Sequence, residues 1–154
     1  MRAIIGRRYK MIKFKLQQPD AKLPTKGSDE AAGLDLYACE NIDIPAGKSA
    51  KINTGVCMEI PSGYVGLIWP RSKISTRFNI DILAGVVDSD YRGEIQIALI
   101  NHGDKPFEVR TGDKIAQMLI QRHFNYFDIE QVDQLSESRR GKQGINSTDT
   151  RLRD

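Results

Sequence analysis

The sequence predicts a single all-β domain, a barrel or a sandwich, that carries one short helix. The first reason is that apolar residues recur at every second position through most of the 154 residues, which is the period of a strand and not of a helix. The second reason is that the apolar runs are short and are separated at regular spacing by Gly- and Pro-rich turns. A chain of this length is the size of one domain and can bury a core without disulfides.

The alternation assigns strands one after another along the chain. ENIDIPAGKSA, residues 40–50, predicts a strand followed by a turn. KINTGVCMEI, residues 51–60, predicts a strand, and YVGLIW predicts the next one at residues 64–69. The buried face of the strand at 51–60 is expected to consist of Ile52, Thr54, Val56, Met58 and Ile60.

The second half continues this pattern after one exception. RSKISTRFN, residues 71–79, follows Pro70 without alternation and predicts a short helix ending at Asn79, a residue that tolerates left-handed geometry. EIQIALI buries Ile95, Ile97 and Leu99, and FEVR and KIAQMLI predict further strands after the turns NHGDKP and TGD. HFNYFDI, residues 123–129, reads as a C-terminal strand apolar enough to need a partner, which favours an oligomer.

Charge and cysteine content exclude several classes of protein. The net charge is only +3, and Lys and Arg are spread among acids, so we expect no nucleic-acid partner. No apolar run approaches the ~18 residues of a membrane span, so we expect no membrane partner. Cys39 and Cys57 lie in no CxxC motif and near no pair of histidines, which favours two buried thiols in a reducing, cytoplasmic compartment over a disulfide or a zinc site.

The two ends of the chain differ from its body. Residues 1–10 read as an N-terminal extension without an assigned role, since Met11 is a possible alternative start. Residues 11–135 form the predicted β domain. Apolar content collapses after Leu135, so residues 136–154 are predicted to form a flexible arm.

GVVDSDYRGE, residues 85–94, is the first segment that could carry chemistry. If it is extended, Asp88 and Asp90 lie on the same side. The apolar Val86 and Val87 precede Asp88, so its carboxylate sits where the chain leaves the core and could act as a general base. The alternative is a hairpin turn with solvated acids.

Four other polar positions are candidates for binding. Arg71 and Ser72 open the predicted helix, where unsatisfied N–H groups and a guanidinium suit phosphate, although a plain cap with a surface arginine fits as well. Asp35, between two leucines, is solvated, salt-bridged or holding the water shell of a metal. Gln117 interrupts an apolar strand, so its amide needs a backbone or ligand partner.

The tail RRGKQGINSTD, residues 139–149, has two interpretations. Its glycines and hydroxyls could cradle phosphate oxygens, as backbone nests do. A segment of this composition is otherwise simply disordered.

The order of these segments carries more information than any one of them. AGLDLYA, PRSKIS, GVVDSDYRGE, GDKIAQMLI and RGKQGINSTD resemble, in this order, the five motifs of the trimeric dUTP diphosphatase (dUTPase) family. The resemblance runs from Met11 to Thr148, and NIDILAGVVDSDYRGE is its longest stretch. It implies a distorted β-barrel or jelly roll of the β-clip type and a homotrimer with three sites between subunits. It also implies hydrolysis of dUTP to dUMP and pyrophosphate with Mg²⁺, which keeps uracil out of DNA and supplies dUMP for dTMP synthesis.

The resemblance also implies a role for each matching residue. Asp88 matches the catalytic carboxylate that deprotonates the attacking water, and Tyr91 matches the aromatic that excludes a 2′-hydroxyl. Asp35 matches the acid that holds Mg²⁺ through water and not directly. The hairpin from Ile82 to Val87 matches the main chain that pairs with uracil, and Gln96 lines the nucleoside pocket. The residues that match phosphate contacts are Arg71, Ser72, Lys73 and Gln117 in the body, and Arg140, Ser147 and Thr148 in the arm. The segment that matches the uracil contacts includes Gly85, Val86 and Val87.

The sequence departs from the family pattern in two motifs. Lys73 stands where a small residue is usual, and Ile145 replaces the phenylalanine that stacks on uracil. Stacking is worth about 1–3 kcal/mol per base, and an aliphatic side chain loses part of that. A dCTP deaminase, which resembles the same fold, is disfavoured because Ala98 occupies the place of its glutamate base. A non-catalytic regulator that binds a protein partner is the other alternative, and the altered tail is its only support.

Overall fold

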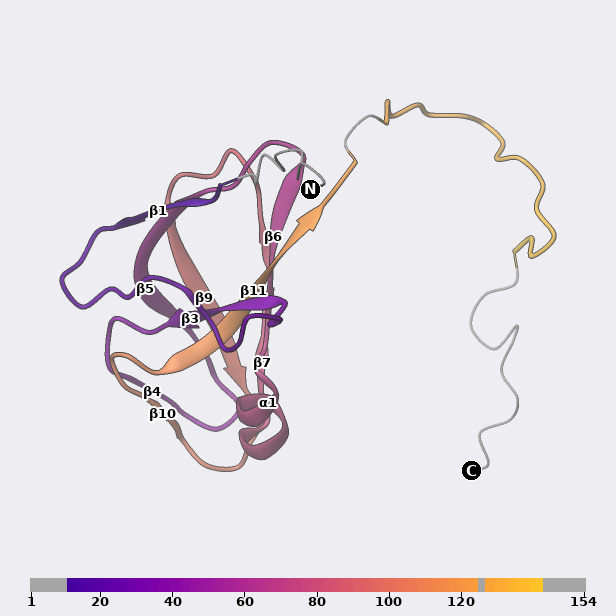
Figure 1. The fold of residues 1–154 in the computed structure, drawn as a ribbon. Coiled ribbons are helices and arrows are strands. Elements are labelled where there is room, and N and C mark those ends of the chain that lie inside the picture. The colour runs from indigo at the N-terminus through magenta and orange to yellow at the C-terminus, as the bar shows by residue number, and fades with distance from the viewer. Residues whose placement is uncertain (1–10, 125–126, 143–154) are drawn as a thin grey trace, which may run out of the picture.

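The computed structural model describes residues 11–124 and 127–142 of the chain. It consists of short strands and one short helix, which confirms the predicted all-β class (Figure 1). Within these residues, no helix is long and apolar enough to cross a membrane. The elements are β1 (Lys13–Leu16), β2 (Thr25–Lys26), β3 (Gly33–Tyr37), β4 (Ile42–Ile44), β5 (Ser49–Glu59), β6 (Tyr64–Trp69), α1 (Ser72–Phe78), β7 (Ile80–Ile82), β8 (Val86–Val87), β9 (Glu94–Asn101), β10 (Phe107–Val109) and β11 (Lys114–Arg122).

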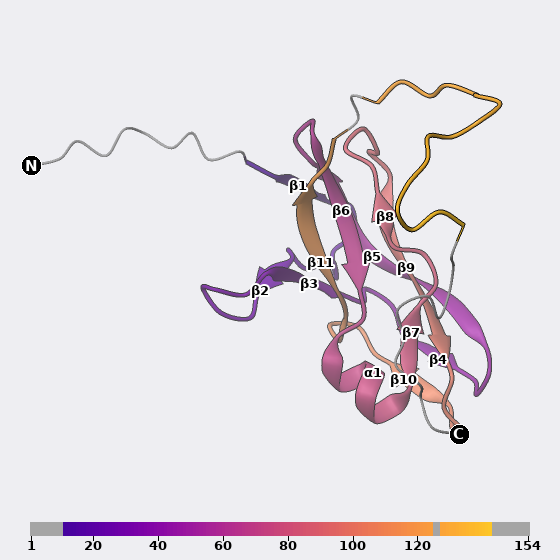
Figure 2. The same ribbon diagram turned by 90° about the vertical axis from the view of Figure 1, so that its right-hand side faces the viewer.

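The strands form two larger sheets and one small pair, all with antiparallel neighbours. One sheet has the order β1-β5-β9-β7, the other has the order β2-β3-β11-β6-β8, and β10 pairs with β4. Figure 2 shows β11, β6 and β8 running alongside β5 and β9, with α1 at one end of the body beside β7. Strands that are distant in sequence therefore meet, and this brings the candidate residues into two groups.

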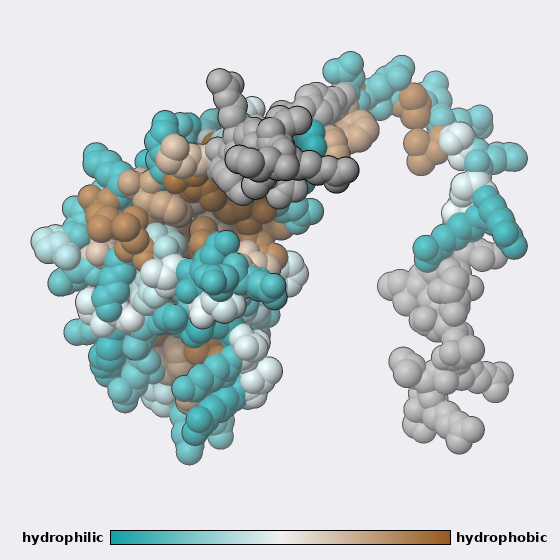
Figure 3. Space-filling view, viewed as in Figure 1, coloured by the Kyte–Doolittle hydropathy of each residue, from teal (hydrophilic) through white to brown (hydrophobic). Residues whose placement is uncertain are grey.

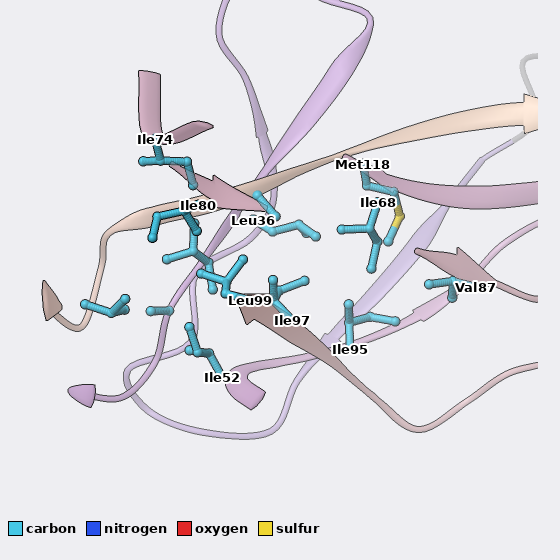
Figure 4. Close-up of a cluster of buried hydrophobic side chains, with 14 of the residues drawn as sticks. Leu36, Ile52, Ile68, Ile74, Ile80, Val87, Ile95, Ile97, Leu99 and Met118 are labelled. Carbon is cyan, nitrogen blue, oxygen red and sulfur yellow. The ribbon is translucent and has the colours of Figure 1, made fainter. Parts of the chain in front are cut away.

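The core lies between the two larger sheets and contains the predicted apolar faces. Ile95, Ile97 and Leu99 of β9 are all at most 2% exposed. They pack with Leu36 and Met118 from the other sheet in one continuous cluster (Figure 4). The predicted buried face of β5 is confirmed as well, and every one of its members is buried: Ile52, Thr54, Val56, Met58 and Ile60.

The predicted helix is confirmed at both ends. It begins after Pro70 and ends at Asn79, which adopts φ 56° and ψ 40°, the left-handed region that asparagine tolerates. The N–H of Asn79 donates to the carbonyl of Ser75 over 3.0 Å. Ile74 is the buried residue that anchors the helix to the core. The helix start at Arg71 and Ser72 is thereby held in a fixed place at the end of β6.

One expectation about the strands proves wrong. The segment from Ile82 to Val87 is not a hairpin, because β7 pairs with β9 in one sheet and β8 pairs with β6 in the other. The segment after Val87 is not extended, because the N–H of Tyr91 donates to the carbonyl of Asp88 over 3.2 Å and closes a turn. The local conformation is therefore a turn, and the role of Asp88 as a general base stays a prediction.

The strand proposed at residues 123–129 includes residues 125–126, which lie outside the described residues, and its expected partner is another subunit. The last strand ends at Arg122, and residues 123–124 and 127–142 contain no strand. Phe127, Ile129 and Leu135 are 80%, 101% and 88% exposed, and this segment runs away from the body (Figure 1). Figure 3 shows apolar side chains among polar ones along it. The N–H of His123 donates to the carbonyl of Gly63 over 3.0 Å, and the described residues after it join no sheet.

The two cysteines behave as predicted. Cys39 and Cys57 are free thiols, 7% and 6% exposed. Burial, followed by the nearby carboxylates of Glu94 and Glu40, raises the pKa of Cys39. Both effects disfavour the thiolate, so this thiol is a poor nucleophile.

Candidate functional site

The first group of predicted residues lines a cleft of about 540 Å³, here named the first cleft. Its walls come from β3, β11, the end of β6 and the start of α1. Five predicted residues line it, namely Asp35, Arg71, Ser72, Lys73 and Gln117, together with Gly27, Ala31, Ala32, Gly33, Trp69, Pro70 and Leu119. Ser72 and Lys73 are exposed, so their polar groups are open to a ligand from solvent.

Asp35 is the centre of an ion cluster in this cleft. Its side chain is only 9% exposed, and each of its carboxylate oxygens takes one cation. Nε of Arg71 donates to Oδ1 over 2.9 Å, and Nζ of Lys114 donates to Oδ2 over 2.7 Å. The hydrogen bond to Asp35 raises the pKa of Lys114, so this amine stays charged. The salt-bridged interpretation of Asp35 is confirmed, and its role toward the water shell of a metal stays a prediction.

Arg71 binds Asp35 through Nε and not through the two terminal nitrogens of its guanidinium. Neither terminal nitrogen has a protein partner within the described residues. A guanidinium presents five donors in a planar fork, so the terminal pair remains able to grip an anion in two places. Asp35 therefore fixes the side chain of Arg71 and leaves its binding edge open.

Gln117 faces the same cleft from β11. Its amide nitrogen donates to the carbonyl of Pro70 over 2.9 Å, so the partner of this amide within the chain is the backbone. Its amide oxygen lies where Gly33 leaves room, because a Cβ at Gly33 would come within 2.7 Å of that oxygen. The amide oxygen has no hydrogen-bond partner among the described residues and remains a free acceptor.

The second group of predicted residues lines another cleft, of about 310 Å³, here named the second cleft. It lies between the segment from Ala84 to Tyr91 and the strand β9 (Glu94–Asn101). Ile82 does not line it, because it belongs to β7. The lining residues are Lys51, Ile68, Ala84, Gly85, Val86, Val87, Asp88, Tyr91, Glu94, Ile95, Gln96 and Ala98.

Two sets of main-chain contacts fix the shape of the second cleft. The carbonyl of Gly85 accepts a hydrogen bond from the N–H of Ile68 over 2.7 Å. A Cβ at Gly85 would lie 3.0 Å from the carbonyl oxygen of Ile68, so a larger residue would crowd this approach. Beyond β8, Arg92 closes the turn by donating from Nη1 to the carbonyls of Ser89 and Tyr91 over 2.7 and 2.9 Å.

The polar side chains of the second cleft are partly held and partly free. The hydroxyl of Tyr91 donates to the carbonyl of Glu94 over 3.0 Å. Gln96 donates to Oδ1 of Asn53 over 2.8 Å. Asp88 is exposed at the end of β8, and its carboxylate makes no hydrogen bond or ion pair with the rest of the described chain. A carboxylate in this state can accept a proton from water.

The predicted site residues are therefore divided between two clefts that share no lining residue. Arg140 is exposed in the arm, and it interacts within the structure. Ile145, Ser147 and Thr148 lie outside the described residues. The described part of the chain has no group of three His, Cys, Asp or Glu side chains close enough to hold a metal ion.

Sequence reasoning missed two residues of the first cleft and its ion cluster. Lys114 completes the charge balance of Asp35, and Trp69 lines the cleft while remaining 54% exposed. Both residues stand in segments that were quoted as motifs or as strands. Alternation gives no sign of either position, and the contact of Lys114 with Asp35 depends on how β3 pairs with β11.

Comparisons with known proteins agree on one family. A model of the dUTPase family matches residues 19–149. The deoxyuridine 5′-triphosphate nucleotidohydrolase of Saccharomyces cerevisiae is 40% identical over 139 residues, which are 90% of this chain and 95% of the yeast protein. The protein of the same name from Clostridium tetani is 46% identical over 139 residues, covering 89% of this chain and 95% of its own.

Solved structures give the same result. A variant of the dUTPase of Staphylococcus bacteriophage 80alpha, with bound dUpNHpp, superposes with a TM-score of 0.85 at 25% identity, covering 92% of this chain and all of the phage chain. A dUTPase variant from phage phi11 of S. aureus, described with a structural Mg(II) ion, has a TM-score of 0.76 at 23% identity and covers 83% of this chain and all of its own. The motifs, the fold and these matches together identify this chain as a member of the dUTPase family.

Proposed function

We propose that this protein hydrolyses dUTP to dUMP and pyrophosphate. The observation that carries the proposal is the first cleft, where Asp35 holds Arg71 by Nε and leaves the forked edge of its guanidinium unpaired beside Ser72, Lys73 and Gln117. A fixed cation fork among hydroxyl, ammonium and amide donors suits a triphosphate. Membership of the dUTPase family supplies the rest of the argument.

The phosphates bind in the first cleft under this proposal. Arg71 grips phosphate oxygens with two parallel hydrogen bonds, and Ser72 and Lys73 add a hydroxyl and an ammonium. Negative charge grows on these oxygens as the α-phosphorus is attacked. Cations that are already held in place stabilise this charge without having to reorganise during the reaction.

The water attacks with the help of Asp88. Its carboxylate is exposed in the second cleft and pairs with no cation in the described chain, so it remains available as a proton acceptor. A positioned general base typically contributes about 10²–10⁴ in rate. Asp88 takes the proton from water as the water oxygen bonds to the α-phosphorus and pyrophosphate leaves.

The base and the sugar bind in the second cleft. Main-chain groups around Gly85, Val86 and Val87 pair with the polar edge of uracil, and cytosine presents the opposite donors and acceptors there. Tyr91 packs on the deoxyribose and leaves no room for a 2′-hydroxyl. Gln96 lines the same cleft and is already oriented by Asn53.

Mg²⁺ fits as a hydrated ion that the triphosphate brings. Each carboxylate oxygen of Asp35 engages one cation and retains a lone pair for a water, and the amide oxygen of Gln117 is a second acceptor in the same cleft. These two residues would hold the ion through its waters, a mode that Mg²⁺ favours. When bound, the ion neutralises part of the triphosphate charge.

The active assembly is a homotrimer under this proposal. The family resemblance implies sites between subunits, so a second copy of the chain would complete a site that uses both clefts. Trp69, Leu83 and Val86 are 54%, 56% and 69% exposed, which is apolar surface that a partner would cover. Under this proposal the arm brings Arg140, Ile145, Ser147 and Thr148 over the nucleotide. The free thiols suit a reducing, intracellular compartment.

Pyrophosphate release tests the proposal directly. The purified protein is incubated with dUTP and Mg²⁺, and with UTP, dCTP and dTTP as parallel substrates. We expect release from dUTP alone, and light scattering coupled to size exclusion should give three times the 17.3 kDa chain mass. Ammonia from dCTP would indicate a deaminase, and a protein inert toward all four nucleotides would indicate a regulator.

A further inference from the structure

The ring of Tyr91 folds back across Gly93, two residues further along the chain. A Cβ built at Gly93 would clash with the hydroxyl of Tyr91 and lie 2.6 Å from Cζ and 2.9 Å from Cε2 of the same ring. Cβ atoms do not approach heavy atoms that closely in proteins. With the ring in this position, glycine is the one residue that fits at position 93.

The backbone itself does not require glycine here. Gly63 and Gly112 have φ of +83° and +90°, the region that favours glycine, whereas Gly93 does not have a positive φ. An alanine at position 93 would therefore keep the backbone unstrained. The requirement for glycine comes from the space that the aromatic ring occupies.

The ring is held at one point and is otherwise easy to move. Its hydroxyl donates to the carbonyl of Glu94 over 3.0 Å, which keeps the ring against the chain. Tyr91 is 46% exposed, so no surrounding core holds its ring in place. A side chain at position 93 would displace the ring into solvent or into the second cleft, and the rest of the fold would keep its packing.

We infer that Gly93 is a positioning residue for sugar specificity, because it sets where the Tyr91 ring stands in the second cleft. The inference rests on the proposed function, in which that ring excludes the 2′-hydroxyl of UTP. Gly93 need not touch the nucleotide. A ring pushed out of its position no longer occupies the space in which a ribose hydroxyl would sit, so discrimination between dUTP and UTP falls.

The test is the ratio of kcat/KM for dUTP to kcat/KM for UTP, measured on one preparation of Gly93→Ala. A partly unfolded preparation lowers both values alike, so the ratio reports on the site and not on the amount of folded protein. Steric rejection of a hydroxyl is worth about 10²-fold, so we expect the ratio to fall at least about tenfold. A wild-type ratio in Gly93→Ala would overturn the inference.

A second comparison shows whether the effect passes through the ring. In a Tyr91→Ala background the ring is absent, so adding Gly93→Ala should leave the ratio unchanged. A further fall in the double variant would contradict the inference, since it would place the effect elsewhere. Ser89→Ala is the matched control in the same turn, because it keeps the carbonyl that accepts from Arg92, and its ratio should equal that of the wild type.

Stability and wild-type activity complete the design. The melting temperature of Gly93→Ala should lie close to that of the wild type, and a fall of more than about 10 °C would show that the Cβ displaces the fold and not the ring, against the inference. A wild-type protein that releases no pyrophosphate from dUTP would overturn the proposed function, and the inference with it. A wild-type protein that prefers dUTP, with an equally selective Gly93→Ala, would overturn the inference alone.

Discussion

Replacing Asp35 by asparagine removes the charge at the centre of the ion cluster and keeps the size of the side chain. In the wild type both carboxylate oxygens are engaged, by Arg71 over 2.9 Å and by Lys114 over 2.7 Å. An asparagine oxygen can still accept from one of them. Its amide nitrogen would face the other cation, and two positive charges would remain close together without an anion between them.

The expected loss of stability follows from the burial of Asp35. Removing one member of a fully buried ion pair costs about 3–5 kcal/mol. The carboxylate is 9% exposed, but its two partners are 30% and 38% exposed, so water screens the cations that remain. We therefore expect a loss of about 2 kcal/mol in the free energy of unfolding, below the fully buried range. For a chain of this length this loss lowers the melting temperature by about 4–8 °C.

Thermal unfolding followed by circular dichroism measures this shift. Protein concentration must be equal in all samples, because association makes the melting temperature depend on concentration. Asp43→Asn is the matched control, since Asp43 pairs with Arg110 on the surface, where the side chains are 58% and 47% exposed. We expect the control to melt within about 1 °C of the wild type, because water screens an exposed pair.

Equal melting temperatures for Asp35→Asn and Asp43→Asn would refute this reasoning. Such a result would mean that the ion pairs of the buried Asp35 stabilise the fold no more than the surface ion pair of Asp43 does. KM for dUTP gives an independent check of the cluster. Without the carboxylate that holds Nε, Arg71 loses its orientation, so KM should rise in Asp35→Asn and stay unchanged in Asp43→Asn.

Three further predictions concern the reaction, the arm and alkaline pH. Asp88→Asn should lower kcat by about 10²–10⁴ and leave dUTP binding intact by calorimetry, and near-normal pyrophosphate release would exclude Asp88 as the base. Ile145→Phe should lower KM or raise kcat, because an aromatic ring stacks on uracil, and unchanged kinetics would mean that the arm does not cover the base. The pKa of Lys114 is raised above 10.5 by Asp35, so the folded state holds this proton more tightly than the unfolded state does. The stabilisation that the ion pair of Lys114 with Asp35 gives the folded state is complete below pH 10.5, and it is lost as pH rises through the pKa of Lys114 in the folded state. The melting temperatures of wild type and Lys114→Met should therefore converge at high pH.

Alternation in the sequence predicts the longer strands and their buried faces, and it misses the short strands β1 and β2. A strand has a period of two whatever its neighbours are, so Ile52, Ile97 and Leu99 could be assigned to the core from the sequence alone. The same pattern says nothing about which strand lies beside which. The hairpin from Ile82 to Val87 is implied by the resemblance alone, and in the structure its two ends belong to different sheets.

The candidate residues were likewise found by type and order, and their contacts were not. Asp35 between two leucines was compatible with water, a cation or the water shell of a metal. Strand β11 lies beside β3, which brings Lys114 to one oxygen of Asp35, and α1 begins where Arg71 reaches the other. The two ion pairs of Asp35 therefore depend on sheet pairing, which the local sequence does not encode.

The glycines of this chain also show that local sequence does not reveal which residues become neighbours in space. A sequence suggests that a glycine serves a turn, and for Gly63 that is correct, because its φ is +83°. At two other positions a neighbouring side chain explains the glycine. The amide of Gln117 occupies the space beside Gly33, and the ring of Tyr91 occupies the space beside Gly93. Both neighbours are proposed ligand contacts, one in each cleft. A missing side chain can thus be part of a binding site, and substitution by alanine at such a position tests the placement of its neighbour more cleanly than removal of the neighbour itself.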